Sequence, residues 1–261
     1  MALYGHELRQ GKGALLIWTA VIACMLGVCV LIFPEMKGQM GEIDGMFSEM
    51  GGFSAAFGMD RVSFGEFMGY FSVECGNVLG LGGAFFAALL GSLALAKEEK
   101  EHTAEFLLTH PISRRRAVVQ KLGAVFTEIA LFQAAVICVA AAATSVIGEK
   151  PELKEMALLF LAYFLLQIEI ASICFGISAF IGRGGLGIGL AIAALFYFLN
   201  IIANLTEQMQ FLKYVTPFGY AEGADILANG GIDAAYLTAG MAFALIGIAA
   251  AFVRYCKKDI A

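Results

Sequence analysis

The sequence predicts an all-α polytopic membrane protein with six transmembrane helices. Three observations lead to this fold class: 60% of the 261 residues are hydrophobic, only 15% are charged, and the mean hydropathy is +0.80. A soluble domain of this length carries more charge and less apolar surface. The apolar residues are also gathered into six runs, each long enough to cross a ~30 Å hydrocarbon core, which takes about 20 helical residues.

The first apolar run follows a short basic segment and is too long for the apolar core of a signal peptide. It ends without a small-residue cleavage site, so we interpret it as a transmembrane helix. Together the runs form a single transmembrane domain over residues 1–261. The six predicted spans are 14–33, 71–96, 117–147, 156–181, 186–205 and 234–253.

Lys and Arg are distributed unevenly between the two sides of the membrane that these spans define. Twelve of the 17 basic residues lie in the terminal segments or in the connections on the same side as the termini. Cytoplasmic connections carry an excess of Lys and Arg, so we expect both termini in the cytoplasm. The predicted location is the cytoplasmic (plasma) membrane, as a multi-pass protein in contact with membrane lipid.

Two connections on the outer side are long enough to hold structure of their own. The segment 34–70 has phenylalanines at near-helical spacings among glycines and acids, which indicates short amphipathic helices at the interface. The segment 206–233 is interrupted by Pro217 and has a Gly-Gly turn before the last span. We expect a short outer helix or a re-entrant hairpin there, and a plain interfacial loop is the alternative.

The sequence predicts neither a metal site nor an enzyme. The six cysteines have no CxxC spacing and no neighbouring His, so we interpret them as small apolar packing residues. The GxGxxG pattern at 182–187 lies between two spans instead of between a strand and a helix, which indicates a tight cytoplasmic turn. The chain therefore has no ATP site of its own, and it lacks the sequence patterns of membrane proteases and hydrolases.

Two carboxylates lie inside the predicted spans, Glu128 in the third and Glu169 in the fourth. An intramembrane carboxylate costs about 2.5 kcal/mol or more at mid-bilayer on insertion scales, so it normally faces the interior of the bundle. Both residues are therefore candidate pathway residues. A hydrogen-bonded packing role is the alternative for each.

Small and amide side chains in the fourth and fifth spans predict close contacts between helices. Ser172 and Gly176 follow Glu169 at helical spacing and should let another helix approach closely. Asn200 and Asn204 lie one turn apart near the outer end of the fifth span, and we expect them to donate interhelical hydrogen bonds.

The segment 97–121, KEEKEHTAEFLLTHPISRRRAVVQK, is the most charged interruption of the apolar sequence. Residues 98–109 can form a short amphipathic helix, with acids at helical spacing on one side and a leucine pair on another. Pro111 ends this helix because the residue before a proline avoids the α region. Ser113 is then placed to cap the N-terminus of the third span.

This order of residues resembles the integral-membrane permeases of ATP-binding-cassette exporters. The resemblance is to the six-helix class whose subunits carry the signature E-x-x-x-G-T-x-E-x-L-L-x-x-P-[IVL]-S-R-x-x-[IV]-x-x-x-K after the second span. His102 stands where that family usually has Gly. The matching positions are the acids Glu98, Glu99 and Glu101, followed by Thr103, Glu105, Leu107, Leu108, Pro111, Ile112, Ser113, Arg114 and Lys121.

The resemblance implies that residues 98–109 are a coupling helix that docks into a cleft of a separate ATPase subunit. ATP and Mg²⁺ would be bound by that partner, and the chain itself would hold no cofactor. A second permease chain, identical or a sister chain, would pair with this one across a central pathway, and no nucleic acid is implied. The substrate stays open. The implied partner-coupling residues are Glu98, Glu101, Thr103, Glu105, Leu107, Leu108, Pro111 and Arg114.

A stand-alone secondary transporter or channel is the alternative function. Such a protein needs no soluble partner and more often shows two related halves or interrupted spans. Neither feature is visible in the sequence, so the permease interpretation is favoured.

Overall fold

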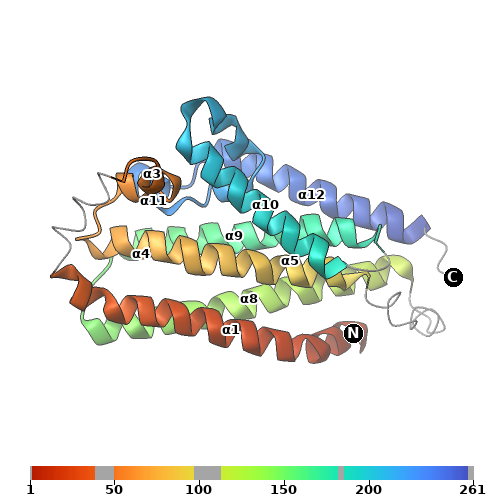
Figure 1. Cartoon of the computed structure of the whole chain (residues 1–261). Coiled ribbons are helices and arrows are strands. Elements are labelled where there is room, and N and C mark those ends of the chain that lie inside the picture. The colour runs from red at the N-terminus through yellow and green to blue at the C-terminus, as the bar shows by residue number, and fades with distance from the viewer. Residues whose placement is uncertain (1, 39–49, 97–112, 182–184, 258–261) are drawn as a thin grey trace.

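The computed structural model describes residues 2–38, 50–96, 113–181 and 185–257. Within these ranges the chain forms helices and connections, without a strand, and six helices are long and apolar enough to cross a membrane. The predicted fold class is thereby confirmed. The six helices run side by side as an elongated bundle, and the start of α1 and the end of α12 lie at the same end of it (Figure 1). We call this the terminal end and the other the opposite end.

The six spans have the following bounds. The second consists of three consecutive pieces that continue one another, and the other five are single helices. They are α1 (Ala2–Lys37), α4–η2–α5 (Phe67–Cys75, Gly76–Leu81 and Gly82–Ala94), α8 (Arg114–Ile147), α9 (Leu153–Ser178), α10 (Gly185–Leu205) and α12 (Ala234–Lys257).

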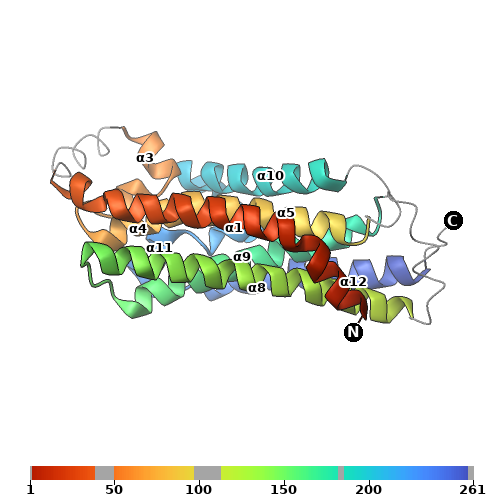
Figure 2. The ribbon, with the colours of Figure 1, turned by 90° about the horizontal axis from the view of Figure 1, so that it is seen from below.

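The first span differs most from its predicted bounds, because α1 begins at Ala2 instead of at residue 14. Hydropathy detects only the apolar part of this helix. The polar first turns of α1 are hydrogen-bonded to α8, because Tyr4 Oη and Thr127 Oγ1 lie 2.9 Å apart. Figure 2 shows α1 and α8 lying beside each other along the bundle.

The start of the third span is fixed by its N-cap, as the sequence predicts. Ser113 has extended backbone angles, and its hydroxyl oxygen accepts a 3.4 Å hydrogen bond from the Arg116 backbone N–H. Such a cap satisfies one of the N–H groups that a helix leaves unpaired in its first turn.

The second span contains a π-helical stretch, η2, between its two α-helical parts. Two of its glycines lie against a tyrosine of α9. A Cβ atom at Gly76 would lie 3.1 Å from Tyr163 Oη, and one at Gly80 would lie 3.1 Å from Tyr163 Cε1. The ring of Tyr163 is therefore accommodated by the absence of side chains on η2.

Close packing between α9 and α12 confirms the predicted role of Ser172 and Gly176. A Cβ atom at Gly176 would lie 2.5 Å from the carbonyl oxygen of Gly247, and one at Gly247 would lie 2.6 Å from the carbonyl oxygen of Ser172. The two backbones approach so closely that neither glycine has room for a larger residue.

The centre of the bundle is formed by α9 and the second span. In each of these two spans, 67% of the most apolar 18-residue stretch is buried inside the bundle. The corresponding share is 28% in α1, 22% in α10 and 17% in α12. These three helices lie at the periphery of the bundle, and they leave most of their apolar surface for lipid or another chain. All six cysteines are free.

At the opposite end, the described parts of the connections hold short helices, as predicted for both segments. The first has α3 (Gly52–Ala56) and η1 (Met59–Arg61). The connection after α10 has η3 (Glu207–Tyr214), η4 (Pro217–Gly219) and α11 (Gly223–Asn229).

The connection after α10 also folds back along that helix. Thr216 Oγ1 donates a 2.8 Å hydrogen bond to the carbonyl of Phe196, which lies nine residues before the end of α10. At 1.5 Å per residue this is a return of roughly 13 Å toward the bundle. Pro217 then begins η4, capped by Thr216. We call residues 206–222 the fold-back segment.

Candidate functional site

The predicted coupling segment lies outside the described residues. Of its partner-coupling residues, only Arg114 is described, and it is the first residue of α8 and half-buried. The two helix ends that flank this segment are the end of α5 and the start of α8. Both helix ends lie at the terminal end of the bundle.

One buried lysine joins three helices at the terminal end. Lys121 of α8 is only 1% exposed, and its Nζ donates a 2.8 Å hydrogen bond to Glu7 Oε1 of α1 and a 2.9 Å hydrogen bond to the carbonyl of Ala94. Ala94 is the last residue of α5. We call this group of three residues the Lys121 clamp.

Two hydrogen-bond acceptors explain why a lysine is stable in this buried position. The last carbonyls of a helix have no partner within it, and they carry partial negative charge. The Ala94 carbonyl is one of these, and the Glu7 carboxylate adds a full negative charge. A buried ammonium with two such acceptors is compensated, whereas removing either acceptor would leave it partly unpaired.

Glu128 lies at the contact between α1 and α8. Its side chain is 4% exposed, and a Cβ atom added to Gly11 would lie 2.1 Å from Glu128 Oε1. Only a glycine at position 11 lets the carboxylate fit between the two helices. The predicted burial inside the bundle is confirmed, and the neighbour is a helix backbone.

Glu169 of α9 is fully buried, and it lies against α12 and the fold-back segment. Its Oε2 atom accepts a 2.9 Å hydrogen bond from the hydroxyl of Tyr220, and a Cβ atom added to Gly240 would lie 2.2 Å from Oε2. Its Oε1 atom has no hydrogen-bond partner among the residues that the structure describes. A buried carboxylate oxygen without a partner is unfavourable, so this position is maintained against a cost in stability.

Tyr220 connects Glu169 to a polar cavity at the opposite end. The cavity has a volume of about 240 Å³, and Arg61, Lys213, Tyr220 and Asp225 are among the residues that line it. The hydroxyl of the same tyrosine donates a hydrogen bond to the buried carboxylate. Glu169 therefore lies one side chain away from this cavity.

The charged residues of the cavity pair with one another. Lys213 Nζ donates a 2.7 Å hydrogen bond to Asp225 Oδ2, and Arg61 donates to Asp225 Oδ1. Burial acts to raise the pKa of Asp225, but the hydrogen bond and charge of Lys213, followed by those of Arg61, outweigh it and lower this pKa below its ordinary value. The cluster holds η1, η3 and α11 together.

Asn200 and Asn204 donate hydrogen bonds, as predicted, but both donate to one carboxylate outside the spans. Their Nδ2 atoms lie 2.9 Å and 3.0 Å from Glu222 Oε2. Glu222 is the residue before α11. The C-terminal end of α10 is thereby bonded to the segment that follows it in the chain.

Sequence reasoning missed the functional side chains of the connecting segments. Tyr220 and Glu222 lie outside the six apolar runs, so their local pattern does not place Tyr220 in a buried position or Glu222 beside the asparagines of α10. The one available signal was the apolar and aromatic content of the sequence around Pro217, which is unusual for an exposed loop. For Lys121 the sequence predicts only its place as the last position of the signature.

These features define a class of protein. A bundle of six apolar helices with buried carboxylates inside the spans is typical of membrane transport proteins. Among the described residues, no group of His, Cys, Asp and Glu side chains could hold a metal ion.

The chain belongs to the ABC-2 family of transporters, because the model of the ABC-2 family transporter protein matches residues 1–260. The chain is therefore a membrane permease without a nucleotide-binding site, and its family implies an ATPase partner. A comparison with curated proteins finds no match.

Proposed function

We propose that this chain is the membrane-spanning permease subunit of an exporter, driven by a separate ATPase that docks on residues 98–109. Family membership supports the need for an ATPase, and the resemblance of the 97–121 segment to the exporter signature supports the docking position and the direction of transport. The positive-inside distribution supports a cytoplasmic terminal end in the plasma membrane.

The Lys121 clamp is the observation that carries the coupling part of the proposal. The docking segment connects α5 to α8, and Lys121 bonds these two helix ends to each other and to α1. A displacement of the docking segment would therefore move three helices together. The proposed docking residues are Glu98, Glu101, Thr103, Glu105, Leu107, Leu108, Pro111 and Arg114.

Glu169 and Glu128 are proposed as pathway residues. Glu169 has the stronger support, because Tyr220 links it to the cavity at the opposite end and one of its oxygens has no partner in the described part of the chain. For Glu128 the support is its burial inside the bundle.

A second permease chain, identical or a sister chain, completes the proposed transporter. The support is the low burial of α1, α10 and α12, which leaves apolar surface for a second chain as well as for lipid. A central pathway between two chains would then be lined by residues from both.

The proposal is tested by purifying the tagged chain from its native membrane and asking whether an ATPase co-purifies. The variants Glu105→Lys and Leu107→Asp should abolish stimulated ATP hydrolysis, because a reversed charge or a carboxylate on the docking face disrupts binding. Leu107→Met is the matched control, since it keeps an apolar side chain of similar volume.

For all three variants, membrane insertion is measured in parallel by fractionation, and folding is measured by the melting temperature. If the purified chain alone, reconstituted in vesicles, transports without any ATPase, it is a stand-alone transporter or channel and the proposal is wrong.

A further inference from the structure

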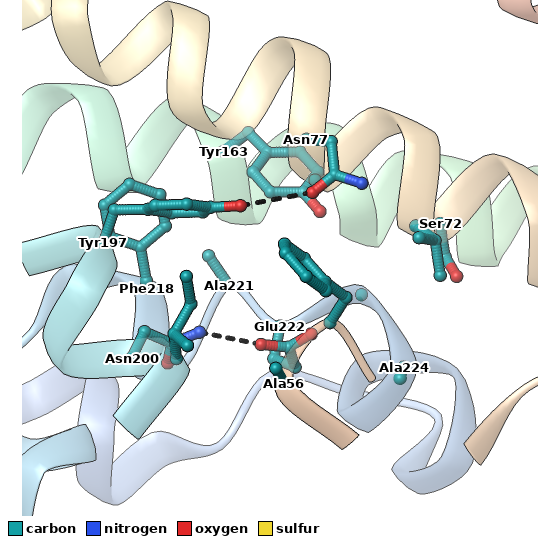
Figure 3. A pocket seen from close by; sticks show the side chains of 15 residues that line it. Ala56, Ser72, Asn77, Tyr163, Tyr197, Asn200, Phe218, Ala221, Glu222 and Ala224 are labelled. Atoms are coloured by element: carbon teal, nitrogen blue, oxygen red, sulfur yellow. Dashed lines mark hydrogen bonds between the residues drawn. The ribbon is translucent and has the colours of Figure 1, made fainter. Parts of the chain in front are cut away.

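A small crevice with several polar side chains lies at the opposite end, separate from the cavity that Tyr220 lines. It has a volume of about 40 Å³ and lies between the second span, α9, α10 and the residues before α11. A single water needs about 10–15 Å³, so the crevice has room for a compact polar group. Figure 3 shows Tyr163, Asn77 and Tyr197 on one side of it and Asn200 and Glu222 on the other.

Two buried polar atoms of the crevice have no hydrogen-bond partner in the described part of the chain. One is the hydroxyl of Tyr163, whose side chain is 1% exposed, and the other is Oδ1 of Asn200, which is 6% exposed. Asn200 uses its Nδ2 atom on Glu222, so its oxygen is left as an acceptor. Buried polar atoms are almost always paired, so these two atoms are available to a group that enters the crevice.

The crevice has an excess of negative charge. Glu222 contributes a carboxylate, and none of the residues that line the crevice is a lysine, arginine or histidine. The nearby cation Arg61 forms ion pairs with Asp60 and Asp225, and it also interacts with the charge of Glu222 at longer range. Two neutral amide donors on one oxygen stabilise the carboxylate of Glu222 but leave its charge in place.

Aromatic side chains form part of the crevice wall, beside small and aliphatic residues. Tyr163 of α9, Tyr197 of α10 and Phe218 of the fold-back segment line it, and the rings of Tyr197 and Phe218 pack edge to face with centroids 5.4 Å apart. The hydroxyl of Tyr197 donates a 3.4 Å hydrogen bond to Asn77 of η2, which holds the Tyr197 ring in position. The faces of aromatic rings attract cations.

The π-helical stretch η2 builds one side of this crevice. Its glycines leave space for the Tyr163 ring, and a Cβ atom at Gly76 would lie 3.1 Å from the Tyr163 hydroxyl. An uninterrupted span with larger side chains would press on this tyrosine. Isolated π-helical turns in membrane and soluble helices occur frequently at functional sites.

We propose that this crevice binds the ammonium group of an organic amine. A carboxylate, unpaired oxygen acceptors and aromatic faces are the combination that recognises an organic ammonium ion. A hard metal ion would need several oxygen ligands in place of aromatic walls. This inference rests on the proposed transport function, because it names organic amines as the substrate class of that transporter.

The test measures binding to the full-length chain in lipid nanodiscs by isothermal titration calorimetry, without any ATPase. The probes are dodecyltrimethylammonium and dodecylamine, with dodecanol as the neutral analogue of the same chain length. Saturable binding of the ammonium probes at least about tenfold tighter than dodecanol is expected, because the neutral head gains nothing from the carboxylate or the ring faces.

Two variants locate the binding to the crevice. Glu222→Gln should weaken ammonium binding about tenfold or more, and Tyr163→Phe should weaken it several-fold while it leaves the ring in place. Glu149→Gln is the matched control, because this carboxylate pairs with Lys37 on the surface at the same end. If Glu222→Gln lowers the melting temperature, the result for Tyr163→Phe decides, since that change removes only an unpaired hydroxyl.

The source of the ammonium group is identified by competition. Displacement of dodecylamine by phosphatidylethanolamine in the nanodisc assigns the site to a lipid headgroup, and displacement only by soluble amines assigns it to free amines. Equal affinity for dodecanol, or unchanged binding in both variants, overturns the proposal. The binding test needs no ATPase, so the two proposals can fail separately. Amine binding by a chain that co-purifies with no ATPase would refute the proposed function alone, and ATPase coupling without amine binding would refute this inference alone.

Discussion

The ammonium of Lys121 lies 2.8 Å from the carboxylate of Glu7, across the contact between α8 and the first turns of α1. The lysine belongs to the signature segment, and the glutamate belongs to the short N-terminal stretch that precedes the first apolar run. The N-terminal stretch is therefore part of the packed structure at the terminal end. Its side chains hold the third span in place.

Replacing Lys121 by Met should lower the free energy of unfolding by about 3 kcal/mol, because the Glu7 carboxylate and the Ala94 carbonyl lose their common partner. Lys121→Arg keeps the charge and is the matched control, with a smaller loss from the tighter fit. Denaturation of the purified chain in detergent gives both values. A Met variant as stable as the native chain would show that the clamp is not a stabilising contact.

Glu169→Gln should reduce transport at least about tenfold and leave insertion and folding intact, because the amide keeps an oxygen that accepts from Tyr220 while the charge is lost. Tyr220→Phe is the companion variant, since it removes the hydrogen bond and keeps the carboxylate. The measurement is the transport rate in reconstituted vesicles over a range of pH. A Gln variant with the native rate at every pH would exclude a pathway role.

Gly240→Ala should destabilise the bundle by about 1–3 kcal/mol, because the new Cβ atom would lie 2.2 Å from Glu169 Oε2 and the buried carboxylate would have to move. Gly187→Ala is the control in another span. Nothing lies within 4 Å of the Cβ position there, so this change should be neutral or slightly stabilising. Melting temperatures of the two variants are compared, and equal losses would contradict the close contact at Gly240.

The ion pairs of Asp225 should make stability depend on pH in the acidic range. Burial opposes the charged form of Asp225, but Lys213 and Arg61 hold its pKa below the ordinary value of about 3.9. A carboxyl group with a lowered pKa stabilises the folded state fully above its unfolded pKa, and this contribution is lost as the pH falls through the folded pKa.

Melting temperatures between pH 7 and pH 3 should therefore fall more steeply in the native chain than in Asp225→Asn. The Asn variant should already be less stable at pH 7, since it lacks the two ion pairs. Parallel curves for the two proteins would show that Asp225 does not carry the dependence.

The fold could be predicted from the sequence to the extent that it depends on local patterns. The six spans follow from apolar length, the start of α8 from the serine that caps it, and the close approach of α9 and α12 from Ser172 and Gly176. The start of α1 could not be predicted, because Tyr4 and Glu7 are held by residues more than a hundred positions away.

The candidate site was predictable only inside the spans. Glu128, Glu169 and the two asparagines of α10 were identified because a polar residue in an apolar run is unusual. The partner of the asparagines was not, since Glu222 is brought to them by the return of the chain along α10. The coupling residues 98–111 lie outside the described residues and stay a prediction.

The π-helical stretch η2 also changes the direction in which the second span presents its side chains. A π turn holds about one residue more than an α turn, and one residue corresponds to about 100° around the helix axis. The face of α4 is therefore not a straight continuation of the face of α5. The two parts of the span therefore contact different elements. α5 contacts α9 and α10, whereas α4 contacts α11 at the opposite end.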